Sequence, residues 1–313
     1  MKNPNSYEAP APVVVRDLVK RYGEVTAVAG LSFEVRRGEV FGLLGPNGAG
    51  KTTTVEILEG LRGRDGGEVR VCGFDPAKAN REVKQRIGVA LQATALPDKI
   101  EVREALDLFA GFYAKRADAA QLLATVGLEE KARSRFDALS GGQQQRLAVA
   151  LALVNEPEVV ILDEPTTGLD AQARRELHGV IDRLRAEERT VILTTHYIEE
   201  AERLCDRVAI VDRGQVIAQG SPRELVARSQ RHSRIELRTA ASIGIAELRQ
   251  LPYIESVAES GGAWQLRSAD APRALIELIR WMEAGGHELL DLHVTRPTLE
   301  DAFVELTGRR IRE

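Results

Sequence analysis

The 313-residue sequence is poor in cysteine and aromatic residues, and it lacks a marked excess of charge of either sign. Its two cysteines, Cys72 and Cys205, are far apart in the chain, which argues against a disulfide framework and favours a reducing compartment. With 43 basic and 47 acidic residues, the net charge of −4 offers no general attraction to nucleic acid or anionic lipid. We therefore expect no nucleic-acid partner.

The sequence also lacks a long apolar run. Its most apolar helical stretch, residues 147–154, is much shorter than the roughly 20 residues that a helix needs to cross a bilayer. The polar, proline-containing residues 1–12 have no apolar signal core and are expected to form a flexible leader. These features predict a cytoplasmic protein that would need a partner to hold it at a membrane.

What the sequence does contain is an alternation of short apolar strands and helical segments over residues 13–228. This order predicts an α/β fold with a mainly parallel sheet. Residues 92–155 include a helical region that is expected to form a separate helical subdomain. Within it, helical spacing predicts one apolar face, made of Ala105, Leu108, Phe109 and Phe112.

The pattern changes after about residue 229. Residues 232–313 read as strand, helix, strand, strand, helix, strand and helix, an order that fits a small ferredoxin-like α+β domain. Thr298 and Asp301 predict a capped start for the last helix. The basic stretch between the two domains is interpreted as a solvated linker. The apolar residues expected in the core of the small domain are Ile235, Leu237, Leu248, Leu266, Ile276, Ile279 and Leu292.

The segment "GPNGAGKTT" satisfies the pattern of a phosphate-binding loop, because it follows an apolar strand and opens a helix. Its backbone N–H groups can converge on phosphate oxygens, Lys51 can reach the terminal phosphates of ATP, and Thr52 can ligate Mg²⁺. Lys51 is expected to face solvent until phosphate binds. The residues expected to bind nucleotide here are Gly45, Pro46, Asn47, Gly48, Ala49, Gly50, Lys51, Thr52 and Thr53.

Two carboxylates end the apolar strand "VVILDE". Asp163 is expected to hold Mg²⁺ through water, and Glu164 to orient or deprotonate an attacking water. The strand and its acids are weak evidence alone, but together with the phosphate-binding loop they indicate a nucleotide-hydrolysing site.

The segment "LSGGQQQR" supplies a second anion cradle at a helix start. Together with "GPNGAGKTT" and "VVILDEP", it makes residues 13–225 resemble the ATP-binding-cassette ATPases. The resemblance implies a P-loop NTPase fold of that type, with a mainly parallel sheet core, an antiparallel β subdomain and a helical subdomain. In that family two cassettes pack head to tail, and the signature of one caps the ATP held by the other. The resemblance therefore implies a second cassette as partner, in a homodimer, with a nucleotide-capping role for Ser140, Gly141, Gly142 and Gln143.

The resemblance also assigns single residues. Tyr22 matches the aromatic residue that stacks on adenine, and Asp170 matches an aspartate at the dimer contact. Gln92 matches the glutamine that links the metal and the attacking water to the membrane partner, and His196 the histidine that contacts the γ phosphate. Glu164, His196, Lys51 and Gln92 are thus the expected catalytic residues, and Thr52, Gln92 and Asp163 the expected metal ligands.

Two further segments narrow the resemblance. "THYIEEAERLCDRVAIVDRG" and the C-terminal "RPTLEDAFVELTG" are similar to the subunits that serve exporters of drugs, antibiotics, lipids or polysaccharides. They imply separate integral-membrane permease subunits, docked on the helical subdomain at the inner face of the membrane. Two alternatives stay open from the sequence: a soluble cassette ATPase without a transport role, and a ligand-sensing regulatory ATPase.

Overall fold

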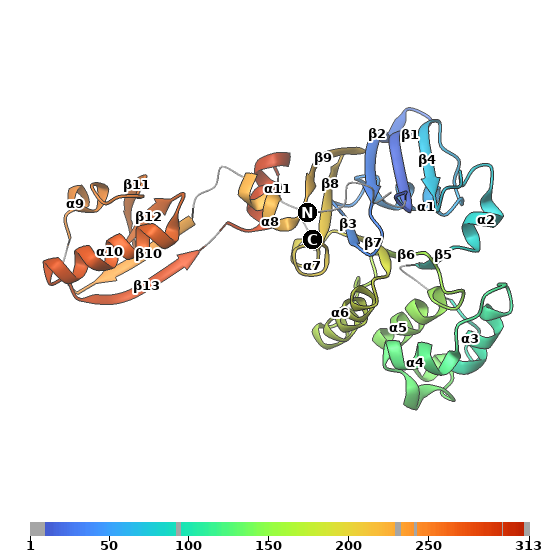
Figure 1. Ribbon diagram of the computed structural model, residues 1–313. Helices are drawn as coiled ribbons and strands as arrows, with labels where there is room; N and C mark the ends of the chain where they lie inside the picture. Colours follow the sequence, from blue (N-terminus) through green and yellow to red (C-terminus); the bar gives the residue numbers. More distant parts are fainter. Residues whose placement is uncertain (1–9, 92–94, 229–232, 241–242, 296, 310–313) are drawn as a thin grey trace, which may run out of the picture. The chain divides into compact units, whose positions relative to one another are not determined.

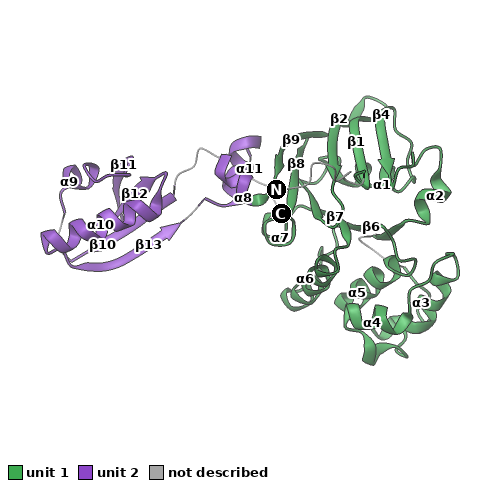
Figure 2. Cartoon of the chain, viewed as in Figure 1, with its two compact units in different colours: residues 1–222, 311–313 green, residues 223–310 purple. Residues whose placement is uncertain are grey.

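The structure, a computed structural model, describes residues 10–91, 95–228, 233–240, 243–295 and 297–309 (Figure 1). The chain divides into two compact units, residues 1–222 with 311–313, and residues 223–310 (Figure 2). Each unit has its own buried apolar cluster. In the part of the chain that the structure describes, no helix has the length and apolar character needed to cross a membrane.

A six-stranded sheet forms the centre of the first unit, in the order β5-β6-β7-β3-β8-β9. Its first five strands run parallel, and the last pair is antiparallel. Strands β3, β6 and β7 are buried along their whole length, as expected for parallel strands covered on both faces. The strands are β3 (Val40–Leu44), β5 (Ile87–Ala90), β6 (Val159–Asp163), β7 (Thr190–Thr195), β8 (Arg207–Asp212) and β9 (Gln215–Gly220).

A second, antiparallel sheet packs against this core. It contains β1 (Val13–Tyr22), β2 (Val25–Val35) and β4 (Gly66–Val71) in the order β2-β1-β4. Phe33 of β2 stacks on Phe41 of β3 with ring centroids 5.3 Å apart, within one shared apolar cluster. The prediction of a mainly parallel core with an antiparallel β subdomain is confirmed.

The helical subdomain is built from α3 (Val102–Ala110), α4 (Ala119–Val126) and α5 (Gly141–Ala152). The predicted apolar face of α3 is only partly right. Ala105 is buried and Phe109 is partly buried, but Leu108 is 50% exposed and Phe112, which lies beyond the end of the helix, is 70% exposed. The buried face is Val102, Ala105 and Leu106, an i, i+3, i+4 set. The other helices of this unit are α1 (Lys51–Leu58), α2 (Asn80–Lys84), α6 (Ala171–Ala186) and α7 (Ile198–Leu204), with 3₁₀ turns at Glu129–Lys131 and Phe136–Ala138.

The small unit has the predicted ferredoxin-like topology. Its four-stranded antiparallel sheet has the order β11-β12-β10-β13, which places the third strand of the chain order between the first and the second. Thr298 and Asp301 form the predicted capping box. The elements are α8 (Pro222–Arg228), β10 (Ser233–Thr239), α9 (Ile245–Arg249), β11 (Ser256–Ser260), β12 (Ala263–Ser268), α10 (Ala271–Gly285), β13 (Leu289–Thr295) and α11 (Leu299–Thr307).

Part of the predicted core of the small unit is wrong. Ile276 and Ile279 are 50% and 43% exposed, because α10 turns Ala274, Leu278 and Met282 inward instead. That i, i+4, i+8 row lies along one side of the helix. The predicted Ile235, Leu237, Leu248 and Leu266 are fully buried, and Leu292 is partly buried against the same cluster.

Candidate functional site

The phosphate-binding loop joins β3 to α1, and close backbone contacts fix its glycines. A Cβ atom at Gly45 would lie 2.2 Å from the carbonyl oxygen of Val211, and one at Gly50 would lie 2.5 Å from that of Ala27. Gly50 also has a φ of +100°, in the region that favours glycine. The loop borders a cavity of about 500 Å³ lined by Val25, Thr26, Ala27, Asn47, Gly48, Gly50, Lys51, Thr52, Thr53 and Glu164.

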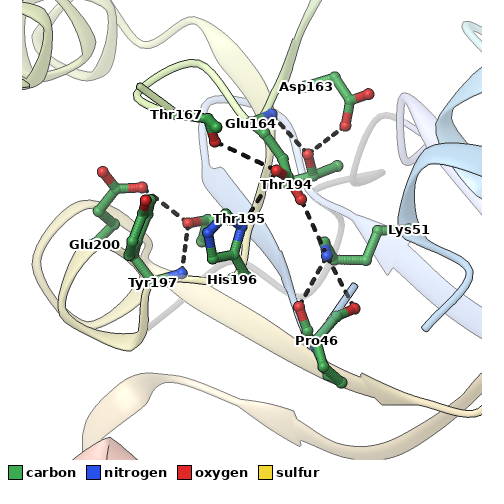
Figure 3. A network of polar contacts seen from close by, with 11 residues as sticks. Pro46, Lys51, Asp163, Glu164, Thr167, Thr194, Thr195, His196, Tyr197 and Glu200 are labelled. Carbon is green, nitrogen blue, oxygen red and sulfur yellow. Dashed lines mark hydrogen bonds and ion pairs between the residues drawn. The ribbon is translucent and has the colours of Figure 1, made fainter. Parts of the chain in front are cut away.

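Lys51 is buried, not solvent-facing as the sequence predicted. Its side chain is 4% exposed, and its Nζ donates hydrogen bonds to the carbonyl oxygens of Gly45 at 2.8 Å and Pro46 at 3.2 Å (Figure 3). The same Nζ lies 3.2 Å from Oε1 of Glu164. The reason is that a buried ammonium group needs acceptors, and the loop and Glu164 supply them.

Glu164 lies between two cationic or potentially cationic groups. Its Oε1 faces Lys51, and its Oε2 lies 3.2 Å from Nδ1 of His196 (Figure 3). Burial acts to raise the pKa of Glu164, but Lys51 and His196 outweigh it and hold the pKa below its usual value. Glu164 has a backbone φ of +45°, which is uncommon for residues other than glycine. The lowered pKa favours an ionised carboxylate on Glu164, in the lining of the cavity.

Asp163 ends β6 and accepts a hydrogen bond from the hydroxyl of Thr194 (Figure 3). Burial, the largest effect, and the charge of Glu164 raise its pKa, while hydrogen bonds from Thr194 and Thr52 oppose them. A hydroxyl and a carboxylate are hard oxygen donors of the kind that Mg²⁺ uses, with phosphate oxygens and water completing its shell. Thr52 and Asp163 therefore fit a magnesium ion chemically.

The sequence did not reveal the side chains that hold His196 in place. Thr195, next to it, donates its hydroxyl to Oε2 of Glu200 at 2.8 Å and accepts from the backbone N–H of Tyr197 at 2.9 Å (Figure 3). These two bonds fix the backbone on both sides of His196. The sequence did contain a signal of this role for Glu200. Glu200 falls on the same helix face as the apolar Ala201 and Leu204, and a carboxylate buried among apolar residues needs a hydrogen-bonding partner.

Glu200 is tied in turn to α6. Its Oε1 lies 3.3 Å from Nε2 of His178, and Nδ1 of His178 lies 2.7 Å from Nη1 of Arg203. Because a guanidinium group can only donate, Nδ1 must accept, so His178 carries its proton on Nε2 and donates it to Glu200. Burial acts to raise the pKa of Glu200, but the hydrogen bonds, that of His178 foremost, lower it overall.

The second cradle lies at the start of α5. Ser140 is exposed, caps the helix and forms a capping box with Gln143. A Cβ atom at Gly142 would lie 2.5 Å from Cβ of Ala173, so the start of α5 packs tightly on the first turn of α6. Asp170 caps α6 by accepting from the N–H groups of residues 172 and 173. Ser140 and Asp170 thus mark two neighbouring helix starts.

Of the other predicted residues, one lies away from this cavity and one falls outside the described residues. Tyr22 ends β1, is 41% exposed and does not line the phosphate-loop cavity. Its ring faces Nζ of Lys20 at 5.4 Å and the guanidinium carbon of Arg62 at 5.6 Å. Gln92, predicted to bind metal and water, lies outside the described residues.

A second, mainly apolar cavity of about 260 Å³ lies where β5 meets the helical subdomain. One of its lining residues is Glu59, which is 2% exposed and whose two carboxylate oxygens have no hydrogen-bond partner in the described part of the chain. The cavity is lined by Glu59, Leu61, Lys84, Ile87, Gly88, Val89, Leu91, Phe109, Tyr113, Leu151 and Ala152.

Curated relatives match nearly the whole chain. The "Nod factor export ATP-binding protein I" of Ralstonia nicotianae is 43% identical over 312 residues, covering 96% of this chain and 94% of the relative. The "Linearmycin resistance ATP-binding protein LnrL" of Bacillus subtilis is 36% identical over 307 residues, with coverages of 95% and 98%.

Solved structures match about two thirds of the chain. cbiO1 from Clostridium perfringens, part of the ABC transporter complex cbiONQ, has a TM-score of 0.63 and 28% identity, covering 70% of this chain and 92% of that one. The cassette MJ0796, dimeric and bound to ADP and Pi in a post-hydrolysis state, has a TM-score of 0.60 and 27% identity, with coverages of 67% and 98%. The family model "ABC transporter" matches residues 28–167. The chain therefore belongs to the ABC transporter family, as one of its ATP-hydrolysing cassette proteins.

Proposed function

We propose that the chain powers a membrane exporter by hydrolysing ATP to ADP and phosphate, with Glu164 as the general base. The observation that carries this proposal is that Glu164, which lines the phosphate-loop cavity together with Lys51, contacts both Lys51 and His196. A carboxylate held ionised by its neighbours can accept a proton from an attacking water. His196, fixed through Thr195, is placed to contact the terminal phosphate and to orient Glu164.

Lys51 has a second role in this scheme. The phosphate oxygens of ATP compete with Glu164 and the loop carbonyls for its ammonium group. We infer that nucleotide binding draws Lys51 away from Glu164, which frees one carboxylate oxygen for water. Mg²⁺, when bound by Thr52 and Asp163, would neutralise charge on the phosphates. Without nucleotide, the carboxylate of Glu164 therefore stays paired with Lys51.

We also propose that the nucleotide lies between two chains. Ser140 and Gln143 hydrogen-bond to each other in a complete capping box, so neither needs another partner within the chain. Ser140 nevertheless remains exposed. An exposed helix start presents N–H groups to an anion from outside. Ser140, Gly141, Gly142 and Gln143 of one chain would cap the ATP bound at Gly45–Thr53 of the other, with Asp170 beside them. Tyr22 would stack on adenine, and Gln92 would link metal and water to the partner.

The 260 Å³ cavity is the proposed docking groove for an integral-membrane permease subunit. Its apolar lining, with Leu61 58% and Leu91 46% exposed, suits the apolar face of a helix. The Nod factor export and linearmycin resistance proteins among the relatives support an export role for this chain, with a drug, antibiotic, lipid or polysaccharide as cargo. We therefore place the protein in the cytoplasm, peripheral to the inner face of the membrane.

The first test replaces Glu164 with glutamine. Hydrolysis should fall by about 10²- to 10⁴-fold, the usual effect of losing a general base, while ATP binding survives through Lys51. Glu156→Gln is the matched control, because Glu156 is an exposed glutamate whose φ of +48° resembles that of Glu164. Near-normal turnover of the Glu164→Gln variant would show that the base lies elsewhere.

The second test asks whether the two cradles act across chains. Lys51→Ala and Ser140→Arg chains each form dimers in which both sites are damaged. A mixed dimer contains one intact site, which joins Lys51 of one chain to Ser140 of the other. We expect nucleotide to be trapped in verified mixed dimers and not in either parent variant. Absence of trapping in mixed dimers would contradict the arrangement across chains.

A further inference from the structure

The imidazole of His196 needs a contact besides Glu164 to fix its orientation. The hydrogen bonds of Thr195 hold the neighbouring backbone, but the ring can still turn about its two side-chain torsions. Nδ1 of His196 lies 3.2 Å from Oε2 of Glu164, yet this buried nitrogen has no hydrogen-bond partner among the described residues. The close approach to Glu164 is therefore not a well-aligned hydrogen bond, and it does not orient the ring by itself.

Tyr197 supplies a second contact. Its ring lies beside that of His196, with the centroids 4.1 Å apart and the planes inclined by 39° (Figure 3). Aromatic rings in close contact attract one another, and a tilted arrangement is more favourable than a direct face-to-face one. The backbone of Tyr197 is also fixed, because its N–H donates to the hydroxyl of Thr195 at 2.9 Å. Tyr197 can therefore support the imidazole from a backbone that is itself held in place.

Arg174 of α6 contacts the ring of Tyr197 in turn. Its guanidinium carbon lies 4.8 Å from the centroid of that ring, within the range of a cation–π interaction. Arg174 forms no ion pair with a described residue, and its buried Nε has no hydrogen-bond partner in the described part of the chain. It also lies near the N-terminus of α6, where the helix dipole disfavours a cation. The ring of Tyr197 therefore provides the favourable contact for this charge.

The start of α6 is a firm support for this contact. The N–H of Arg174 donates to the carbonyl oxygen of Asp170 at 3.0 Å, and the side chain of Asp170 caps the helix. The preceding residue, Ala173, packs tightly against the start of α5. Contacts therefore run from the first turn of α6 through Arg174 and Tyr197 to the ring of His196.

We propose that Tyr197 and Arg174 are positioning residues that hold the imidazole of His196 at the terminal phosphate of ATP during hydrolysis. This inference rests on the role proposed above for His196. In that scheme nucleotide draws Lys51 away and Glu164 turns to the attacking water, so a contact that does not depend on Glu164 must keep His196 in place. Tyr197 and Arg174 act through His196 and are assigned no contact with ATP. Small displacements of a group that orients the reactants are costly to the rate.

The first experiment compares steady-state ATP hydrolysis by the full chain and by two variants of Tyr197. Tyr197→Ala removes the ring, and kcat should fall by about 2- to 12-fold, the equivalent of one aromatic pair, while KM for ATP changes by less than about twofold. Tyr197→Phe keeps the ring with both of its contacts and should retain kcat. Tyr253→Ala is the matched control, because Tyr253 belongs to the small unit and its ring also faces an arginine, Arg273, at 5.7 Å. It should leave hydrolysis unchanged.

A double-mutant cycle tests whether Arg174 acts through Tyr197. Arg174→Gln should lower kcat, and the variant with both changes should lose no more than Tyr197→Ala alone, because the two side chains serve one contact. Circular dichroism checks that each variant is folded. Losses that multiply in the double variant would overturn the proposal. So would an unchanged kcat in Tyr197→Ala, or equal losses in Tyr197→Ala and Tyr197→Phe.

His196→Ala separates a failure of this inference from a failure of the role proposed for His196. Tyr197→Ala should cause no further loss of kcat in the His196→Ala background, and a further loss would overturn the inference. Normal hydrolysis by His196→Ala would remove the role of His196 and the inference with it. Impaired hydrolysis by His196→Ala, together with normal hydrolysis by Tyr197→Ala, would overturn the inference alone.

Dimerisation is measured separately, on sizing columns with ATP in the Glu164→Gln background. The ATP-bound dimer should form to the same extent with and without Tyr197→Ala. Loss of the dimer would place Tyr197 in the contact between chains and overturn its positioning role.

Discussion

Replacing Glu59 with glutamine should stabilise the first unit at alkaline pH and have little effect at acidic pH. Glu59 caps the C-terminus of α1, is 2% exposed, and has no hydrogen-bond partner for either carboxylate oxygen in the described residues. Burial, followed by the charges of Asp163 and Glu56, raises its pKa from 4.5 to about 8. The folded chain therefore holds a proton on Glu59 at neutral pH.

The sign and size of the effect follow from proton linkage. Between pH 4.5 and about 8 the unfolded chain has lost the proton that the folded chain keeps. The free energy of unfolding therefore falls as the pH rises through this window, by about 1.4 kcal/mol per pH unit, and levels off above it. Over the whole window the loss is about 5 kcal/mol. Glutamine cannot ionise, so the variant lacks this loss.

Urea unfolding followed by far-UV circular dichroism at several pH values measures the difference between variant and parent. Trp264 and Trp281 both belong to the small unit, so tryptophan fluorescence reports that unit separately and should be the same in both proteins. Glu82→Gln, at an exposed position of α2, controls for the loss of a charge. An advantage of Glu59→Gln that is the same at pH 5 and pH 8 would refute the reasoning.

Three further outcomes are expected. Lys51→Ala should lower ATP hydrolysis by about 10²- to 10³-fold, the scale for losing one charge-stabilising donor, with circular dichroism checking that the chain stays folded. Thr195→Val should lower kcat with little change in KM for ATP. Thr195→Ser keeps the hydroxyl that donates to Glu200 and should retain activity. Equal losses of activity in the two variants would exclude the hydroxyl as the cause. Ending the chain after Arg228 should leave a cassette that melts cooperatively and binds ATP, since the two units have separate apolar clusters. Calorimetry of the shortened chain measures this. A loss of cooperative melting would show that the two units share one core.

The elements proposed to bind phosphate could be predicted from the sequence because their chemistry is local. A glycine-rich turn between an apolar strand and a helix needs glycines at fixed positions, and the contacts of Gly45 and Gly50 with Val211 and Ala27 explain why. The order of strands and helices likewise predicted the parallel core and the ferredoxin-like unit, because short connections leave few topologies.

Helix faces were predicted less well. Apolar residues such as Leu108 and Ile276 occur at helical spacing, but periodicity does not say which of two apolar stripes meets the core. That choice depends on the neighbouring elements, which lie far away in the chain. The buried positions include the small residues Ala105 and Ala274, while the larger Leu108 and Ile276 remain half exposed.

What the sequence by itself determined was the set of candidate reactive groups: Lys51, Asp163, Glu164 and His196, each at the end of an apolar strand or the start of a helix. Only the tertiary structure decided their electrostatic state. Lys51 became buried and paired with Glu164, Glu200 and His178 became the support of His196, and Glu59 became an unpaired buried carboxyl. These properties depend on burial and on distances between segments that are far apart in the chain. Lys51 and Glu164, for example, are more than a hundred residues apart. The pattern of a sequence does not encode such distances directly.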